Sequence, residues 1–137
     1  MNIQQAIEEG KIKKVIPDRL KAKALVKASA EAIHAAKELL LNETNAKSIL
    51  RELYEGLRQY CEALGVSRGL KFGSHEVIAI FIADTLSEKR IAFRFDTYRK
   101  IRNGINYYGD EVSLEIVKEA LTEIPALIEE LKKHATQ

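Results

Sequence analysis

The chain is poor in the residues that build small cross-linked or fibrous proteins. Its 137 residues include one cysteine, two prolines, seven glycines and no tryptophan. The single Cys61 excludes an internal disulfide and fits a reducing, cytoplasmic environment. So few prolines and glycines exclude a low-complexity or linker-dominated chain. The length predicts one domain that can bury a core without disulfides or metals.

Signatures of several common function classes are also missing. No apolar run reaches 18 residues, so we expect no membrane-spanning segment, and the N-terminus lacks the apolar stretch of a secretory signal. No GxxxxGK[ST], GxGxxG or GxSxG motif is present. The three histidines lie far apart in the sequence, so we predict neither a metal site nor a cofactor. His75 follows a glycine-containing loop, and we interpret it as a partly buried residue of a first helical turn, with a functional role as the alternative.

Helical periodicity covers nearly the whole chain, without a convincing strand pattern. After a short helix near residues 3–9, we expect long helices at about 17–41, 46–65, 75–86, 88–108 and 113–134. Short loops between long amphipathic helices predict an all-α, antiparallel up-and-down bundle of four to five helices. Residues 1–137 then form a single domain, with 1–16 as an N-terminal extension and a core of about 17–133.

Local patterns add detail to these helices. The apolar stripe expected on the first long helix is rich in small residues, which suggests close helix–helix approach: Leu20, Ala24, Ala28, Ala32, Ala36 and Leu39. Ser74 is the expected N-cap of the helix at about residues 75–86. That helix is apolar almost all round, so we expect it to be buried centrally or at a subunit interface. Pro125 lies inside the last helix and should kink it.

The net charge is only +2, but charges of opposite sign are segregated. Residues 11–27 and 88–103 are basic, whereas residues 110–130 are acidic. This distribution permits an anionic partner on one side of the molecule. The alternative is that these charges form ordinary solvated helix faces.

The segment YRKIRNGINYYG, residues 98–109, carries the densest polar edge. Helical spacing places four polar residues on one side: Arg99, Arg102, Asn103 and Asn106. The other side is expected to face the core: Tyr98, Ile101, Ile105 and Tyr108. The arginines could bind phosphate oxygens, or they could pair with acidic residues of a neighbouring helix. Gly104 costs about 1 kcal/mol relative to alanine inside a helix, which suggests that a backbone or a ligand approaches it closely.

The order of these elements resembles the HEPN domain family of small prokaryotic helical proteins. The resemblance covers about residues 17–133 and is carried by NAKSILRELYEGLRQYCEALG, GLKFGSHEVIAIFI and RKIRNGINYYG. It implies a dimeric helical bundle with the fourth long helices near the two-fold axis. Many members are metal-independent ribonucleases that use an arginine, a polar residue and, four to six residues later, a histidine. Members often act as toxins paired with a minimal nucleotidyltransferase antitoxin, and others are non-catalytic.

Arg102 and Asn103 match the start of the family motif, but Tyr107 stands where the histidine is expected. Tyrosine has a pKa near 10, so it is a poor general base at neutral pH. Arg102 and Tyr107 also lie about 140° apart on a regular helix, so a shared site needs a distorted helix end or a partner subunit.

The sequence therefore predicts a homodimeric HEPN-like protein that binds RNA or nucleotide phosphates, within a toxin–antitoxin pair. Arg99 and Arg102 would hold phosphates, Asn103 and Asn106 would add hydrogen bonds, and Tyr107 and Tyr108 would contact a base, a ribose or a phosphate. One alternative is a metal-independent endoribonuclease that uses Arg102, Asn103 and Tyr107. The other is a non-catalytic module that binds a nucleotidyltransferase.

Overall fold

The computed structural model describes residues 1–135, which form six α-helices, two short strands and a final 3₁₀ turn. In chain order the elements are α1 (Ile3–Glu8), β1 (Ile12–Lys14), α2 (Arg19–Glu38), α3 (Ala46–Val66), β2 (Leu70–Phe72), α4 (Glu76–Asp84), α5 (Lys89–Tyr108), α6 (Leu114–Leu131) and the turn Lys132–His134. No helix within the described residues is both long and apolar enough to cross a membrane. The predicted all-α helical bundle is confirmed.

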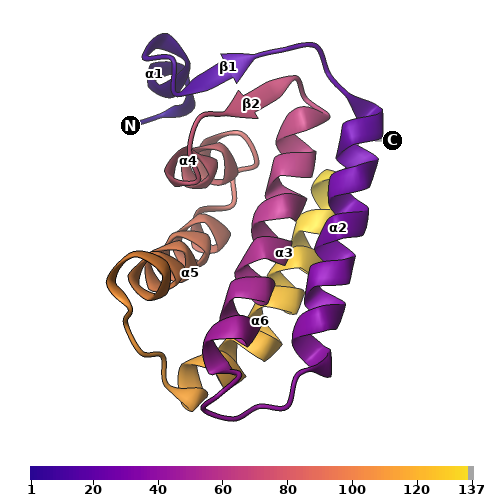
Figure 1. Cartoon of the computed structure of the whole chain (residues 1–137). Coiled ribbons are helices and arrows are strands. Elements are labelled where there is room, and N and C mark those ends of the chain that lie inside the picture. The colour runs from indigo at the N-terminus through magenta and orange to yellow at the C-terminus, as the bar shows by residue number, and fades with distance from the viewer. Residues whose placement is uncertain (136–137) are drawn as a thin grey trace.

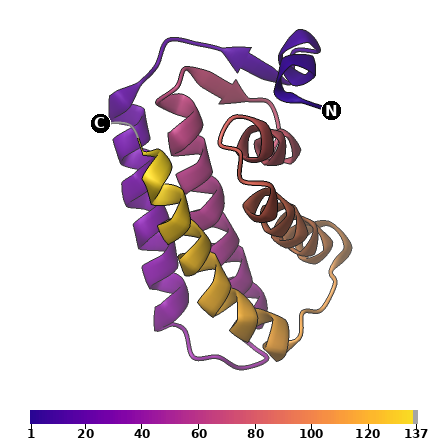
Figure 2. The same ribbon diagram turned by 180° about the vertical axis from the view of Figure 1, so that it is seen from behind.

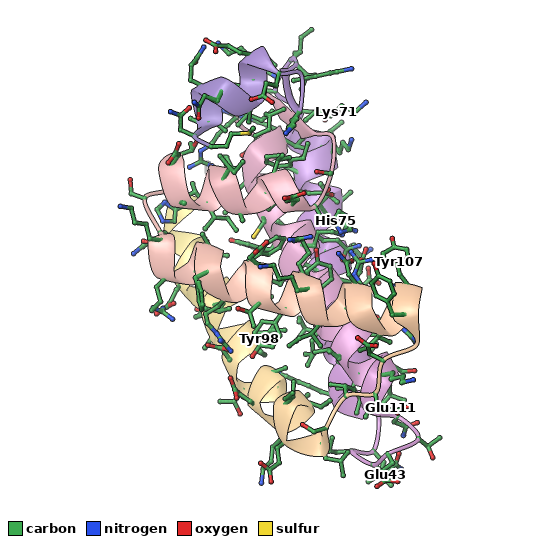
Figure 3. All side chains as sticks on the ribbon, turned by 90° about the vertical axis from the view of Figure 1, so that its left-hand side faces the viewer. Glu43, Lys71, His75, Tyr98, Tyr107 and Glu111 are labelled. Carbon is green, nitrogen blue, oxygen red and sulfur yellow. The ribbon has the colours of Figure 1, made fainter. Side chains whose placement is uncertain are left out.

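Three long helices, α2, α3 and α6, pack along one another and form one side of the bundle (Figures 1 and 2). α2 and α3 lie side by side, and α6 packs against α3 from behind (Figures 1 and 2). The other two core helices, α4 and α5, run across these three helices (Figure 3). As a result α3 has neighbours on several sides, and its predicted apolar stripe is buried: Leu50, Leu53, Tyr54, Leu57, Cys61 and Leu64.

The first long helix, α2, approaches α3 closely, as predicted, but part of its predicted apolar stripe is exposed. α2 packs on α3 through small residues, and the Ser29 hydroxyl donates a 2.6 Å hydrogen bond to the Gly56 carbonyl. Leu20, however, is 81% exposed, because the buried side of α2 is the one that carries Ala22, Ser29 and Ala36. The helix also begins after Pro17, since the Asp18 side chain accepts from the Lys21 N–H as an N-cap.

The N-terminal extension explains why the third long helix is apolar almost all round. β1 pairs antiparallel with β2, with Ile12 opposite Phe72, and this two-stranded sheet and α1 pack over α4. The sequence did not reveal the strands because three residues are too few to show an alternating pattern. Ser74 is not the N-cap of α4, since His75 occupies that position and makes no capping bond.

The last two helices agree with their predicted positions. α5 buries Ile91, Phe95, Tyr98 and Ile105. α6 begins after the N-cap Ser113 and continues through Pro125 to Leu131. All of the predicted site residues stand on α5.

Candidate functional site

Arg102 lies on α5 where the helix meets α3 and the start of α4. The helix is held by its buried apolar face and ends at Gly109, whose φ of 66° lies in the left-handed region that glycine tolerates. Arg102 itself is half-buried, and the carbon of its guanidinium lies 4.9 Å from the centre of the Tyr54 ring. A cation over an aromatic face is attracted by the ring, so Tyr54 of α3 fixes the position of this guanidinium.

His75, at the N-cap position of α4, completes what we term the Arg102 cluster, made of Arg102, His75 and Tyr54. The Nη2 atom of Arg102 lies 2.6 Å from Nδ1 of His75, and the Tyr54 hydroxyl lies 3.1 Å from the same nitrogen. Figure 3 shows His75 between α4 and α5. An arginine can only donate, so Nδ1 of His75 is the acceptor and its proton is on Nε2.

The surroundings keep both partners of Arg102 neutral at physiological pH. Burial, together with the charges of Arg58 and Arg102, lowers the pKa of His75 to about 4, against an opposing contribution from Glu55. Burial also raises the pKa of Tyr54 to about 12, although Arg102 opposes this shift. Arg102 therefore carries a positive charge that neither of its two closest side chains neutralises.

Two neighbouring arginines, Arg58 and Arg99, have acidic partners, but Arg102 has none among the described residues. Arg58 is paired with Glu55 and Glu62, and the Arg99 Nε lies 2.8 Å from a carboxylate oxygen of Asp96. The Nε atom of Arg102 is buried and has no hydrogen-bond partner within residues 1–135. A buried donor without a partner carries a free-energy penalty, which a bound acceptor would relieve.

Beside the Arg102 cluster the surface is hollowed into a groove of about 230 Å³, lined by Arg51, Glu52, Tyr54, Glu55, Arg102 and Asn106. Arg51 Nε donates a 2.8 Å hydrogen bond to the Asn106 side-chain oxygen, and Arg51 forms no ion pair within the described chain. Two arginines that form no ion pair within the described chain thus meet at one groove, which Glu52 and Glu55 also line. Guanidinium groups bind phosphate oxygens through paired, charge-assisted hydrogen bonds, so the groove has the chemistry of a phosphate site.

The acidic face of α6 neutralises the other end of α5. Arg94 lies 2.7 Å from Glu123 and 2.8 Å from Glu119, and Arg90 is paired with Glu130. Pairing with a neighbouring acidic helix was the alternative for Arg99 and Arg102, but it is seen for Arg90 and Arg94 instead. Arg99 pairs with Asp96 of its own helix, and Arg102 forms no ion pair within the described residues.

The predicted site residues are only partly brought together. Asn106 lines the groove with Arg102, whereas Arg99 contacts Asp96 and reaches the cluster only through its charge. Asn103 is half-buried and makes no side-chain hydrogen bond within residues 1–135. These placements leave the predicted role of Asn103 without a contact to support it in one subunit.

The two tyrosines of the segment lie outside the cluster. Tyr107 is 70% exposed near the end of α5 (Figure 3), and Tyr108 is 81% exposed. The expectation that Tyr108 faces the core is wrong, because the last turn of α5 extends beyond the helices that cover its middle. Since α5 is an unbroken helix up to Tyr108, it does not bring Tyr107 to Arg102, and a joint site would need a second subunit.

The environment of Gly104 also differs from the expectation. A Cβ atom at this position would collide with the carboxylate of Asp110, which follows the helix end. The Asp110 N–H donates to the Gly104 carbonyl at 3.1 Å. The close neighbour of Gly104 is therefore the chain's own turn rather than another backbone or a ligand.

His75 and Tyr54 are the site residues that sequence reasoning did not select. Tyr54 fits the apolar stripe of α3, and His75 is one residue at a helix start, 27 positions from Arg102. The only signal was the position of His75 after a glycine-containing loop. No local spacing could relate three residues on three different helices.

Comparisons with known proteins found no match: no protein-family model, no curated protein and no solved structure resembles this chain significantly.

Proposed function

We propose that this protein binds the phosphodiester backbone of RNA in the groove beside Arg102. The observation that carries the proposal is the state of Arg102, which is half-buried, faces only neutral partners and has an unpaired Nε. A phosphate in the groove would supply the missing negative charge, and it would supply the missing acceptor once the guanidinium turns to expose its buried Nε. Arg51, which also lacks an acidic partner in the described chain, lies on the same groove and could hold a neighbouring phosphate oxygen.

Exposed aromatic rings support a single-stranded nucleic acid rather than a free phosphate ion. Tyr107 and Tyr108 stand on the turn of α5 that follows the groove residue Asn106, and both are largely exposed. Bases stack on exposed aromatic side chains in single-stranded RNA complexes. The two tyrosines therefore keep their predicted role as base or ribose contacts next to the phosphate site.

The HEPN resemblance extends the proposal to assembly. We propose a homodimer formed through α5, whose outward side carries Phe93, which is 69% exposed, and Tyr107, fourteen residues or about four turns later. A role in a toxin–antitoxin pair with a minimal nucleotidyltransferase rests on the same resemblance. Light scattering of the pure protein at micromolar concentration should give twice the chain mass of 15.5 kDa, and a monomer would contradict the dimer.

RNA binding is tested with a fluorescent single-stranded RNA and two matched variants of α5. We expect Arg102→Ala to weaken binding at least tenfold, since it removes the charged donor at the centre of the groove. Arg94→Ala should leave affinity within threefold of the native protein, because α6 already neutralises Arg94. Affinity should also fall steeply with salt concentration, as counterion release requires.

A third variant tests whether negative charge in the groove opposes RNA binding. Glu52 lines the groove with Arg51 and Arg102, so Glu52→Gln should strengthen RNA binding about twofold to threefold by removing a repulsive charge. Equal losses in the Arg94 and Arg102 variants, or no measurable binding by the native protein at low salt, would refute the proposal.

A further inference from the structure

A neutral imidazole contacts Arg102 beside the proposed phosphate site, although α5 itself contains no histidine. His75 is held between α4 and α5, with Nδ1 2.6 Å from the Arg102 guanidinium. It is half-buried, so it is anchored by its neighbours and still borders the surface. Because Nδ1 accepts a hydrogen bond from Arg102, its lone pair is present and directed at the guanidinium that would meet a phosphate.

We propose that His75 accepts the ribose 2′-hydroxyl proton when RNA bound in this groove is cleaved, with Arg102 holding the phosphate under attack. This inference rests on the RNA binding proposed above. The 2′-oxygen attacks the adjacent phosphorus as its proton passes to Nδ1, and the bond between phosphorus and the 5′-oxygen breaks. The leaving 5′-oxygen takes a proton from water, and His75 returns its proton to solvent. The products are a 2′,3′-cyclic phosphate and a 5′-hydroxyl end.

Binding of the phosphate would itself free the proton acceptor. When the Arg102 guanidinium and the Tyr54 hydroxyl, which lies 3.1 Å from Nδ1, turn from Nδ1 to the phosphate oxygens, the lone pair of Nδ1 is released. The phosphate charge would also offset the nearby arginines. The pKa of His75, about 4 in the free protein, would then rise towards the ordinary 6.5 and make the imidazole a stronger base.

The other candidate bases are less suited to this step. Tyr107 is 70% exposed and makes no contact with Arg102. Tyr54 touches the cluster, but burial raises its pKa to about 12, so its hydroxyl stays protonated. His75 is thus the side chain of the Arg102 cluster that is both in place and deprotonated at neutral pH.

The test compares His75→Asn with His34→Asn on one RNA, in EDTA, with product ends identified by mass spectrometry. Asparagine keeps a hydrogen-bonding group near the position of Nδ1 but cannot take up a proton. We expect native protein to form cyclic phosphate ends, His75→Asn to cleave at least 100-fold more slowly, and its RNA affinity to stay within threefold. His34→Asn changes an exposed histidine of α2 that lies beside Glu38, so this variant should cleave within twofold of the native rate.

The pH–rate profile separates proton transfer from a merely structural role. Charged and titratable groups face His75 from both neighbouring helices: Tyr54, Glu55 and Arg58 of α3, and Arg99 and Arg102 of α5. We expect the native rate to rise with pH and level off above an apparent pKa between about 4 and 6.5. The residual rate of His75→Asn should lack this step.

The possible outcomes distinguish failure of the cleavage proposal from failure of the RNA-binding proposal on which it rests. RNA binding without cleavage by the native protein overturns the inference and leaves the binding proposal intact, whereas absence of binding removes both. Cleavage by His75→Asn at the native rate, or an equal loss of cleavage in His34→Asn, contradicts the assignment of the proton transfer to His75. If His75→Asn does not fold, the NMR titration of native His75 decides. Its pKa should rise by about one unit when a 2′-deoxy analogue of the RNA binds, and an unchanged pKa contradicts the inference.

Discussion

Arg94 and Arg102 stand eight residues apart on α5, and each lies over a tyrosine ring, but the two arginines differ in their charged neighbours. Arg94 lies 5.2 Å from the ring centre of Tyr98, much as Arg102 lies 4.9 Å from that of Tyr54. Around Arg94, however, two carboxylates of α6 complete the cluster, whereas around Arg102 the third partner is a neutral histidine.

The difference separates an arginine that stabilises the fold from one that is available to a ligand. Burial would raise the pKa of Glu123, but hydrogen bonds from Arg94 and Tyr98 outweigh it and lower that pKa, so the cluster is ionised and internally balanced. No carboxylate within the described residues balances Arg102. The same residue type therefore has a structural role at one end of the helix and a proposed binding role at the other.

The largest expected effect is on stability, and it separates the two arginines directly. Arg94→Ala removes charge-assisted bonds to Glu123 from a side chain that is 24% exposed, so the free energy of unfolding should fall by about 2 kcal/mol. Arg102→Ala removes a cation without an acidic partner and should change it by less than about 1 kcal/mol. Urea unfolding of both variants checks this, and a larger loss in Arg102→Ala would reverse the comparison.

A smaller effect is expected from pH, because His75 titrates differently in the folded and unfolded chains. Its folded pKa of about 4 lies below the unfolded value of about 6.5, so between these values the unfolded chain binds more protons. His75 thus contributes stability that is present above pH 6.5 and is lost as pH falls towards 4. After solvent screening of this half-buried ring, the loss should be about 1–2 kcal/mol.

This pH dependence is checked by urea unfolding at several pH values. Native protein should lose more stability between pH 6.5 and 4 than His75→Asn, in which this titration is absent. In Arg102→Ala, the NMR-measured pKa of His75 should be higher than in native protein, because one nearby positive charge is gone. Parallel stability curves for native protein and His75→Asn would show that the Arg102 cluster does not hold His75 neutral.

The smallest effect concerns the helix end beside Arg102. Alanine at Gly104 gains about 1 kcal/mol of helix propensity but displaces the carboxylate of Asp110, the flexible end of an exposed side chain. For Gly104→Ala, we expect the free energy of unfolding, measured by thermal denaturation, to stay within about 0.5 kcal/mol of the native value. Its RNA affinity should stay within twofold of that of the native protein. Gly109→Ala is the matched control, and its left-handed backbone should cost about 1 kcal/mol. A stronger effect at Gly104 would show that the Arg102 cluster depends on the turn after α5.

Much of the fold could be predicted because its signals are local. The 3/4 spacing of Leu50, Leu53 and Leu57 predicted α3 and its buried side, and Ser113 marked the start of α6. The errors fell where tertiary packing decides. Leu20 matched an apolar stripe but lies on the uncovered side of α2, and Tyr108 matched the inward side of α5 but extends beyond its neighbours.

The sequence by itself determined the helices, their polar and apolar sides and the position of Arg102 on a basic segment, because each follows from the regular repeat of a single helix. Only the tertiary structure decided which arginines are neutralised, since the acidic residues opposite Arg94 come from α6. It alone brought His75 and Tyr54 to Arg102 from two other helices. Charge balance and hydrogen bonding are set by distances in space, and these distances depend on how whole helices pack.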